Sequence, residues 1–302
     1  MPSDVSSIAA CSGTGREAGS ACDHRAVPVV CSRIRLDACP RTVAGVLRDA
    51  RMVAAALGRE GHRFAADRPL LVGGDEVRID ALVAAGIRVP LRTVVTAVSP
   101  GGFASALRSG PLRRLEHVVS IAADGPLTEV HDEVRWAAPC GWAVDPLLLR
   151  ARMGGLLVAR AQELTTRVAA LATQPVIVAT AIVRDGQVLA ARRTRPSAVA
   201  GRWELPGGRV EVAEAEAEAA AVVRECREEL DAQVLPTGRL GTDLPIDAGV
   251  LRVHVARLAP GSPQPRALEH GALRWLGVAE LDTVDWIDAD RAVLADLAAL
   301  LR

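Results

Sequence analysis

Short apolar runs alternate with turn residues through the first half of the chain. Pro28 to Ala38 indicates a strand, and Pro40 to Leu57 has apolar residues at the three- and four-residue steps of a helix. Glycine and proline turns separate four further runs that predict strands: Glu76–Leu82, Arg92–Ala97, Leu115–Ile121 and Thr128–Trp136. Asp145-Pro146 then predicts the start of a long helix to about Leu171, because Asp is a favoured N-cap and Pro a favoured first helical residue.

The pattern changes after Thr173-Gln174-Pro175, which ends that helix. Val176–Val183 and Val188–Ala191 flank a short Arg-Asp-Gly turn, as in a β-hairpin. A helix from about Ala215 to Leu230, several strands and a closing helix from Ala289 to Leu301 follow. The break at this point marks a domain boundary.

A length of 302 residues suits two domains of ordinary size better than one. Residues 1–27 are rich in Ser, Ala and Gly, so we expect them to form a disordered tail. The predicted organisation is therefore this tail, a first domain over 28–172 and a second domain over 175–302.

The charge balance limits the class of partner. The chain has 36 basic and 36 acidic residues, so it has no overall electrostatic attraction to nucleic-acid polymer or to an acidic membrane. It contains no Lys, Asn or Tyr. Every contact between a charged basic side chain and a phosphate must therefore come from Arg, and no Asn can contact a base.

The cysteine pattern and the apolar stretches predict the cellular location. The six cysteines form no CxxC pair, and no His stands at zinc-ligand spacing from them, so we expect reduced thiols. The first 27 residues have no long apolar core, so they do not resemble a signal peptide. Leu147 to Ala159 is interrupted by two arginines and is too short to span a bilayer. We expect a cytoplasmic protein.

The order of elements over 28–172 resembles the SRPBCC or START-like (helix-grip) superfamily, which includes polyketide cyclase-like and lipid-transfer proteins. The resemblance also rests on the Leu115-Glu116-His117 and Glu129–Val134 runs before the long Arg-rich helix. It implies an α+β fold, in which a curved antiparallel sheet surrounds a long C-terminal helix and leaves a cavity for a small apolar ligand.

Two groups of polar residues in this first domain have ordinary structural interpretations. His117 and His131 lie on neighbouring predicted strands, and we favour cross-strand partners on a partly solvated face over a pair that lines the cavity. Arg150, Arg152 and Arg160 are interpreted as a solvated helix face rather than an anion site.

The second domain contains a carboxylate cluster. Glu225, Glu228 and Glu229 are spaced i, i+3 and i+4, which places them on one face of a helix. Adjacent carboxylates repel one another unless a cation compensates them, and hard divalent cations prefer oxygen ligands and bridge carboxylates to phosphates. Arg224 can hold one carboxylate in place. The alternative is a solvated Glu/Arg face, which the preceding strand, Leu-Pro-Gly-Gly turn and helix start make less favourable.

These residues resemble the Nudix box, and residues 175–302 resemble the MutT-type branch of that family. The resemblance implies an α/β/α sandwich with a mixed sheet and a magnesium-dependent hydrolase in which manganese can substitute. It implies these roles: Gly207, Glu225, Glu228 and Glu229 as metal ligands, Arg193 and Gly208 as substrate contacts, and Arg224, Glu225 and Glu269 as catalytic residues, with either Glu225 or Glu269 as the general base.

The sequence departs from the box at two positions. The spacing from Gly208 to Arg224 is two residues too long, so the first box Glu is Glu214 when counted forward and Glu216 when counted back. We expect the insert to lie in a loop or a frayed first turn. Asp231 stands where the box has a Gly with positive φ, and Asp tolerates that conformation at a cost of about 1 kcal/mol.

The MutT-type resemblance implies cleavage of a nucleoside triphosphate to a monophosphate and pyrophosphate, an activity that cleans nucleotide pools. Counting from Trp275 places Asp290 at the base-contacting position. An ionised Asp only accepts hydrogen bonds, which favours the amino group of a (d)CTP-like substrate over 8-oxo-dGTP. The latter is a close second, since a protonated Asp also donates. A helix-capping role is the alternative for Asp290.

Two other functions are consistent with the sequence. The first domain can bind an apolar ligand while a weakened Nudix domain senses a nucleotide, or the enzyme can hydrolyse another nucleoside diphosphate-linked compound. The retained Glu225, Glu228 and Glu229 favour the triphosphate hydrolase, and the two-residue insert favours the sensor.

Overall fold

The computed structural model describes residues 27–84, 86–139 and 146–302. The chain divides into two compact units, one ending at Ala172 and the other beginning at Thr173. Residues 1–26 of the expected tail and the expected helix cap at Asp145 lie outside the described residues. Within these ranges, no helix is both long and apolar enough to cross a membrane.

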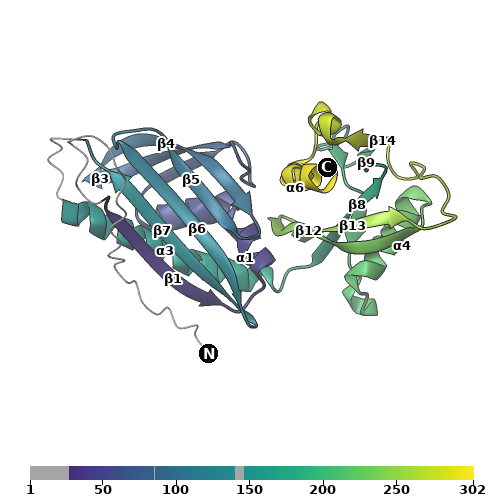
Figure 1. Cartoon of the computed structure of the whole chain (residues 1–302), viewed down its shortest axis with the longest axis horizontal. Coiled ribbons are helices and arrows are strands. Elements are labelled where there is room, and N and C mark those ends of the chain that lie inside the picture. The colour runs from purple at the N-terminus through teal and green to yellow at the C-terminus, as the bar shows by residue number, and fades with distance from the viewer. Residues whose placement is uncertain (1–26, 85, 140–145) are drawn as a thin grey trace. The chain divides into compact units, whose positions relative to one another are not determined.

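The first unit contains an antiparallel sheet whose strand order is β1-β7-β6-β5-β4-β3-β2 (Figure 1). The strands are β1 (Val29–Leu36), β2 (Arg63–Ala66), β3 (Glu76–Ala84), β4 (Ile87–Ser99), β5 (Gly102–Ser109), β6 (Arg114–Asp124) and β7 (Leu127–Ala137). In β7 every second residue is buried from Thr128 to Trp136, so one face of the strand covers the core.

The long helix α3 (Pro146–Leu171) packs against β1 and against the helix α2 (Ala50–Arg59). Val30, Val134, Trp136 and Leu157 form a buried cluster between this helix and the sheet. The predicted antiparallel sheet around a long C-terminal helix is therefore confirmed.

Several predicted elements in this unit need correction. The helix expected over 40–57 is two helices, α1 (Pro40–Leu47) and α2. Asp49 has extended backbone between them, and its side chain accepts a hydrogen bond from the Arg51 amide, which caps a new helix. The strands β2 and β5 were not predicted. The Gly-, Ala- and Ser-rich β5 has little intrinsic strand preference, and its pairing with β4 and β6 decides its conformation.

The polar residues of this unit also differ from expectation. His117 pairs with Val134 in the sheet register and His131 pairs with Ser120, so the two histidines are not cross-strand partners and lie on opposite faces. Arg160 is 5% exposed, so the interpretation of the arginines as a solvated helix face is wrong for this residue. Its contact with Asp132 of β7 brings it into the interior.

One cysteine differs from the expected reduced state. Cys31 is disulfide-bonded, whereas Cys39 and Cys226 are free. The expectation of reduced thiols is therefore wrong at Cys31, because spacing along the chain does not show which sulfurs the fold brings together. Disulfides are rare in cytosolic proteins, so a cytoplasmic location stays a prediction.

The second unit is built on a mixed sheet of order β10-β9-β8-β13-β12, with β11 paired to β8 and β14 paired to β9 (Figure 1). The strands are β8 (Val176–Arg184), β9 (Gln187–Arg192), β10 (Trp203–Glu204), β11 (Gly207–Arg209), β12 (Val234–Ile246), β13 (Gly249–Leu258) and β14 (Ala272–Gly277). β13 runs parallel to β8, and the other described pairs are antiparallel. The predicted mixed sheet is confirmed.

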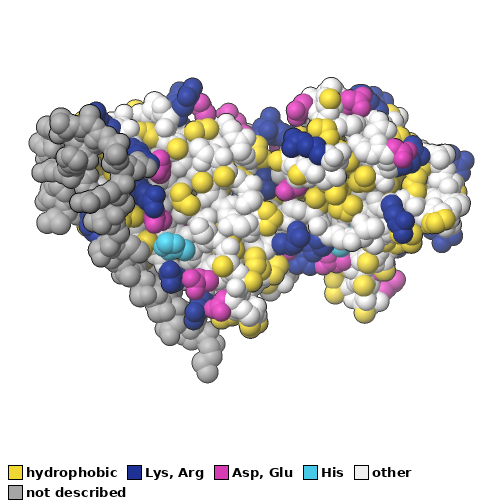
Figure 2. All heavy atoms as spheres, viewed as in Figure 1, with side chains coloured by type: hydrophobic (Ala, Val, Ile, Leu, Met, Phe, Trp, Pro, Cys, Tyr) yellow, Lys and Arg dark blue, Asp and Glu magenta, His cyan; other side chains and the backbone are white. Residues whose placement is uncertain are grey.

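The helix α4 (Glu218–Leu230) covers this sheet with one apolar face, formed by Ala221, Val222, Cys226 and Leu230. The predicted closing helix is split into α5 (Asp288–Arg291) and α6 (Leu294–Leu300), and short helical turns cover Val212–Glu214 (η1) and Val278–Thr283 (η2). Figure 2 shows basic, acidic and apolar side chains interspersed on the visible face, in keeping with the balanced charge.

Candidate active site

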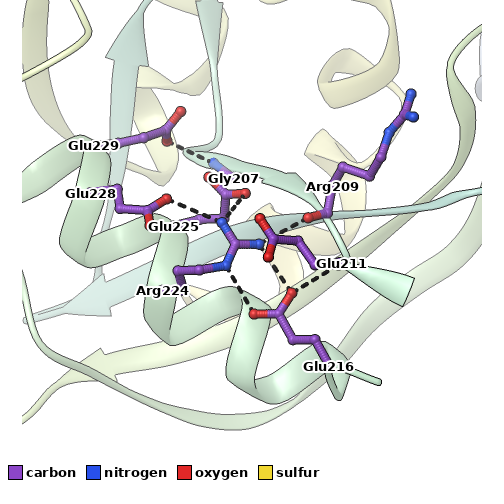
Figure 3. A network of polar contacts seen from close by, with 8 residues as sticks. All are labelled: Gly207, Arg209, Glu211, Glu216, Arg224, Glu225, Glu228 and Glu229. Carbon is purple, nitrogen blue, oxygen red and sulfur yellow. Dashed lines mark hydrogen bonds and ion pairs between the residues drawn. The ribbon is translucent and has the colours of Figure 1, made fainter. Parts of the chain in front are cut away.

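Two glycines allow β11 to approach its neighbours closely, Gly208 on the side of the helix α4 and Gly207 on the side of β8. A side-chain Cβ on Gly208 would lie 2.2 Å from Oε1 of Glu225, and one on Gly207 would lie 2.1 Å from the Val178 carbonyl oxygen. Any larger residue at either position would therefore displace the backbone or the carboxylate. The Gly-Gly turn predicted from the sequence lies directly against a box glutamate (Figure 3).

Arg224 is the centre of the polar network in Figure 3. Its Nε and Nη2 donate to the two oxygens of Glu216 at 2.9 and 3.0 Å. Its Nη1 donates to Glu225 at 2.8 Å and to Glu228 at 3.1 Å, and Nη2 also donates to the Arg209 carbonyl at 2.9 Å. One guanidinium thus holds three carboxylates, and the bidentate contact with Glu216 raises the pKa of Arg224 above its ordinary value.

The two-residue insert lies in the loop before α4, as expected. Glu214 is exposed in η1, and Ala215 takes a left-handed conformation with φ of 52°. Glu216 lies beyond this turn, where hydrogen bonds from Arg224 and from the Glu211 amide lower its pKa. Of the two residues that counting left open, Glu216 is the one that contacts Arg224.

Glu229 and Glu225 are partly removed from water. Burial, with smaller contributions from the nearby Glu204 and Glu225, raises the pKa of Glu229 to about 7 against the opposing effects of His270 and the Gly207 amide. That amide donates to Oε2 of Glu229 at 2.9 Å. Burial also raises the pKa of Glu225. The helix face therefore carries more negative charge than Arg224 can balance.

The donors on this face suit a hard divalent cation, because every candidate ligand is an oxygen atom. Within the described ranges, no three His, Cys, Asp or Glu side chains already converge on a common point. The hydrogen bonds explain this: Arg224 holds Glu225 and Glu228, and the Gly207 amide holds Glu229. A cation would need these carboxylates to turn away from their present donors.

Two polar residues near the Nudix box, Glu204 and His270, were not predicted from the sequence. Glu204 of β10 accepts hydrogen bonds from Arg193 and, at 3.1 Å, from Nε2 of His270. Burial alone would lower the pKa of His270, but Glu204 and Glu229 outweigh it and the pKa is raised. Glu204 directly precedes the Leu-Pro-Gly-Gly turn, which is the signal that could have indicated it. His270 follows Glu269 but belongs to no spacing pattern.

Arg193 and Glu269 have other partners in the structure. Arg193 is paired with Glu204, and its Nε donates to the Arg195 carbonyl at 3.1 Å. The Glu269 side chain is 50% exposed and accepts a hydrogen bond from Arg195 at 2.9 Å. Their described contacts do not join either residue to the carboxylates of α4, so their expected roles stay predictions.

Asp290 is buried at 2% exposure in α5. Its Oδ2 accepts a hydrogen bond from the Leu205 amide at 2.9 Å, while Oδ1 is buried without a hydrogen-bond partner in the described part of the chain. Burial raises the pKa of Asp290 to about 8. Removal from water therefore favours the neutral acid, which can also donate, over the ionised form that the substrate prediction used.

Asp231 ends α4 in the conformation that the box glycine would take. Its φ is 51° and its ψ is 32°, in the left-handed region. Its side chain pairs with the exposed Arg266. The substitution of Asp for Gly thus preserves the expected backbone turn.

The second unit thus combines a mixed sheet with a glycine turn pressed against a row of glutamates, and comparison with known proteins identifies its class. The family model described as the NUDIX domain matches residues 173–297. A Mycobacterium tuberculosis protein named as a candidate 8-oxo-dGTP diphosphatase 2 is 48% identical over 130 residues, which is 42% of this chain and 89% of that protein. The chain therefore belongs to the Nudix family of hydrolases.

Two further proteins are similar to parts of the chain. The CTP pyrophosphohydrolase of Escherichia coli is 32% identical over 125 residues, covering 41% of this chain and 91% of that protein. The structure of a START superfamily protein from Mycobacterium smegmatis covers 47% of this chain and 98% of its own, with 18% identity and a TM-score of 0.38.

Proposed function

We propose that the second unit hydrolyses a nucleoside triphosphate to a nucleoside monophosphate and pyrophosphate, with Mg²⁺ as cofactor and Mn²⁺ as a substitute. The observation that supports this most is the crowding of Glu225, Glu228 and Glu229 beside the Gly207-Gly208 turn, with raised pKa values at Glu225 and Glu229. Carboxylates in this state gain most from a divalent cation.

The ligands proposed for the cation are the three glutamates and the Gly207 carbonyl. When bound, Mg²⁺ neutralises phosphate charge and lowers the pKa of the attacking water. Arg224 positions Glu225 and Glu228, and Glu216 holds Arg224 in turn. Gly208 lets the backbone approach closely. Arg193 would contact a phosphate after exchanging its pairing with Glu204 for the substrate.

Glu225 is the general base that the geometry favours. Its raised pKa makes it a better proton acceptor near neutral pH than an ordinary Glu, and it lies against Gly208. Glu269 is half exposed and paired with Arg195, which supports it less. Replacing the base with Gln should lower kcat by about 10²- to 10⁴-fold. Glu225→Gln should therefore show this loss and Glu269→Gln a smaller one.

The raised pKa of Asp290 changes the substrate that we favour. A neutral carboxyl can donate to O6 of 8-oxoguanine while it accepts from the N7–H that oxidation creates, whereas unmodified guanine presents two acceptors there. Oδ1, which is buried without a hydrogen-bond partner among the described residues, is the oxygen that we propose for this contact. The name of the M. tuberculosis relative points the same way. We therefore place 8-oxo-dGTP ahead of the (d)CTP that the sequence favoured.

A (d)CTP-like substrate is the second candidate. The carbonyl oxygen of a neutral Asp290 can still accept from the N4 amino group of cytosine, and the E. coli relative is named a CTP pyrophosphohydrolase. The two candidates are distinguished by how replacement of Asp290 changes kcat/KM for each nucleotide.

A nucleotide panel tests the proposal. Pyrophosphate and nucleoside monophosphate release would be measured with 8-oxo-dGTP, dGTP, dCTP and dUTP, with Mg²⁺ and with EDTA. A mismatched hydrogen bond costs roughly 1–3 kcal/mol, so 8-oxo-dGTP should exceed dGTP in kcat/KM by about ten- to a hundredfold. Asp290→Asn, which still donates and accepts, should keep this preference, and Asp290→Leu should remove it.

Other outcomes would point elsewhere. Preference for dCTP over 8-oxo-dGTP would support the second candidate. Nucleotide binding without turnover in Mg²⁺ or Mn²⁺ would support a sensor, and turnover restricted to nucleoside diphosphate-linked compounds would overturn the choice of triphosphate.

A further inference from the structure

The first unit encloses a cavity of about 190 Å³ between α3 and the sheet. Most of its lining is apolar, including Val95, Phe103, Met153, Leu156 and Leu157. An apolar cavity of roughly 150 Å³ accommodates benzene. The cavity therefore suits a hydrophobic body of about eight non-hydrogen atoms.

A charged cluster interrupts this apolar lining. Asp132 of β7 is bonded through Oδ1 to Nε2 of His117 at 2.6 Å and through Oδ2 to Nε of Arg160 at 2.8 Å. Burial would raise the pKa of Asp132, but His117 and Arg160 outweigh it and lower the pKa. Asp132 is therefore an ionised carboxylate that orients two donors, and both of them line the cavity.

One donor in this cluster has no acceptor. Nη2 of Arg160 is buried and makes no hydrogen bond within the described residues. The Arg160 side chain is only 7% exposed, so it has little access to bulk water. Buried N–H groups are almost always paired in folded proteins, so this nitrogen indicates an acceptor supplied by a ligand.

We propose that the cavity binds a small hydrophobic carboxylate, with its head group on Arg160 and its apolar body on Met153, Leu157 and Phe103. The guanidinium fork matches the charge and the planar geometry of a carboxylate. A phosphate ester would bring more charge and more acceptors than this apolar lining can satisfy. Ser105, which faces His117 across β5 and β6, adds a hydroxyl near the head group.

Arg152 is the other charged residue in the lining. Its Nη1 donates to the Leu82 carbonyl at 3.0 Å, and its Nε is also buried without a partner in the described part. It precedes Arg160 by eight residues, so it lies about 12 Å away along α3. Arg160 is the proposed anchor because it is the more deeply buried and because Asp132 fixes its orientation.

Calorimetric titration of the full chain with matched probes tests the proposal. Decanoate and 2-naphthoate would be compared with decan-1-ol and 2-naphthylmethanol, which have the same apolar bodies without the charge. At least one carboxylate should bind ten or more times more tightly than its alcohol. Arg160→Met should weaken that carboxylate at least tenfold and its alcohol less than threefold.

Two further variants keep the test decisive. Arg160→Met leaves His117 as the remaining partner of the buried Asp132 and can unfold the unit, so Arg160→Met/Asp132→Leu removes both charges together and should abolish the same carboxylate preference. Arg150→Met is the control, since Arg150 is on the same helix but outside the cavity lining. It should change neither affinity.

Three results would overturn the proposal: no binding of either carboxylate, equal affinity for carboxylate and alcohol, or a preference that survives the double variant and is lost in Arg152→Met. Because none of these measurements involves nucleotides, failure here would leave the proposed hydrolase untouched.

Discussion

The two units each contain a partly buried cluster of charges, but the central residues of the two clusters have opposite charge. In the Nudix unit one cation, Arg224, faces Glu216, Glu225 and Glu228. In the first unit one anion, Asp132, faces Arg160 and His117. Arg224 cannot balance all the carboxylates on its helix face, which indicates a cation as the ligand of the Nudix unit. In the first unit Arg160 keeps a buried donor with no acceptor in the described part of the chain, which indicates an anionic ligand.

The clusters also differ in how the chain builds them. Glu225, Glu228 and Glu229 are within five residues on one helix, while His117, Asp132 and Arg160 come from two strands and a distant helix. A helix presents i, i+3 and i+4 on one face wherever it forms. Side chains from separate elements meet only when the strands pair and the helix packs in one particular register. The same kind of cluster is therefore visible in the sequence in one unit and invisible in the other.

The largest expected effect tests whether the cluster around Asp132 stabilises the first unit. Arg160→Met should lower the free energy of unfolding by about 3–5 kcal/mol, because it leaves Asp132 as a buried, poorly compensated charge. Chemical denaturation monitored by circular dichroism would measure this. The double variant Arg160→Met/Asp132→Leu should recover most of the loss. If Arg160→Met alone is as stable as the unmodified protein, the cluster around Asp132 does not stabilise the first unit, and the two clusters do not differ in this respect.

In the Nudix unit the same kind of change should affect activity and spare the fold. Glu229→Gln and Glu228→Gln should each lower Mg²⁺-dependent kcat at least a hundredfold, about 3 kcal/mol, because each removes a charge that a hard cation needs. Pyrophosphate release gives the rate. Asp282→Asn, an exposed acid in η2, is the matched control. Near-normal rates in both Glu variants would exclude the metal assignment.

Asp290 should make stability depend on pH. Its folded pKa of about 8 lies above the ordinary value, so the folded state keeps a proton that the unfolded chain releases near pH 4. Stability is then lost as pH rises from about 4 through 8, by about 2.5 kcal/mol between pH 5 and 7. Denaturant titrations at several pH values would show a smaller slope in Asp290→Asn. Parallel curves would indicate an ionised Asp290.

The insert gives a smaller effect and decides between the two box positions. Glu216→Gln should lower kcat about tenfold, or about 1.4 kcal/mol, because Arg224 loses its bidentate partner. Deleting Ala213-Glu214 restores the usual spacing and keeps Glu216, so kcat should change less than twofold. A large loss from the deletion together with a normal Glu216→Gln would show that Glu214 has the box role.

The smallest effect concerns the end of α4. Asp231→Gly should stabilise the protein by about 0.5–1 kcal/mol, because glycine takes the left-handed conformation without strain. The exposed pair with Arg266 contributes little against this gain. Thermal unfolding should show a slightly higher Tm and unchanged kcat. A lower Tm would mean that the Arg266 pair matters more than the backbone.

Much of the Nudix unit could be predicted because its signals are local. The box spacing, the Gly-Gly turn and the hairpin each depend on residues close in sequence, and the family assignment and the mixed sheet are confirmed. In the first unit the order of elements predicted the sheet and the long helix. The break at Asp49 and the strand β5 were not predicted, because a cap and two neighbouring strands decide them.

The sequence by itself determined which residues share a helix face and which positions need glycine, since both follow from backbone geometry within a few residues. Only the tertiary structure decided that Glu216 pairs with Arg224, that burial raises the pKa of Asp290 and that Arg160 carries a donor without an acceptor among the described residues. Each of these properties depends on how exposed a side chain is to water and on which hydrogen-bond partners lie beside it. Both are determined by elements from distant parts of the chain that pack together.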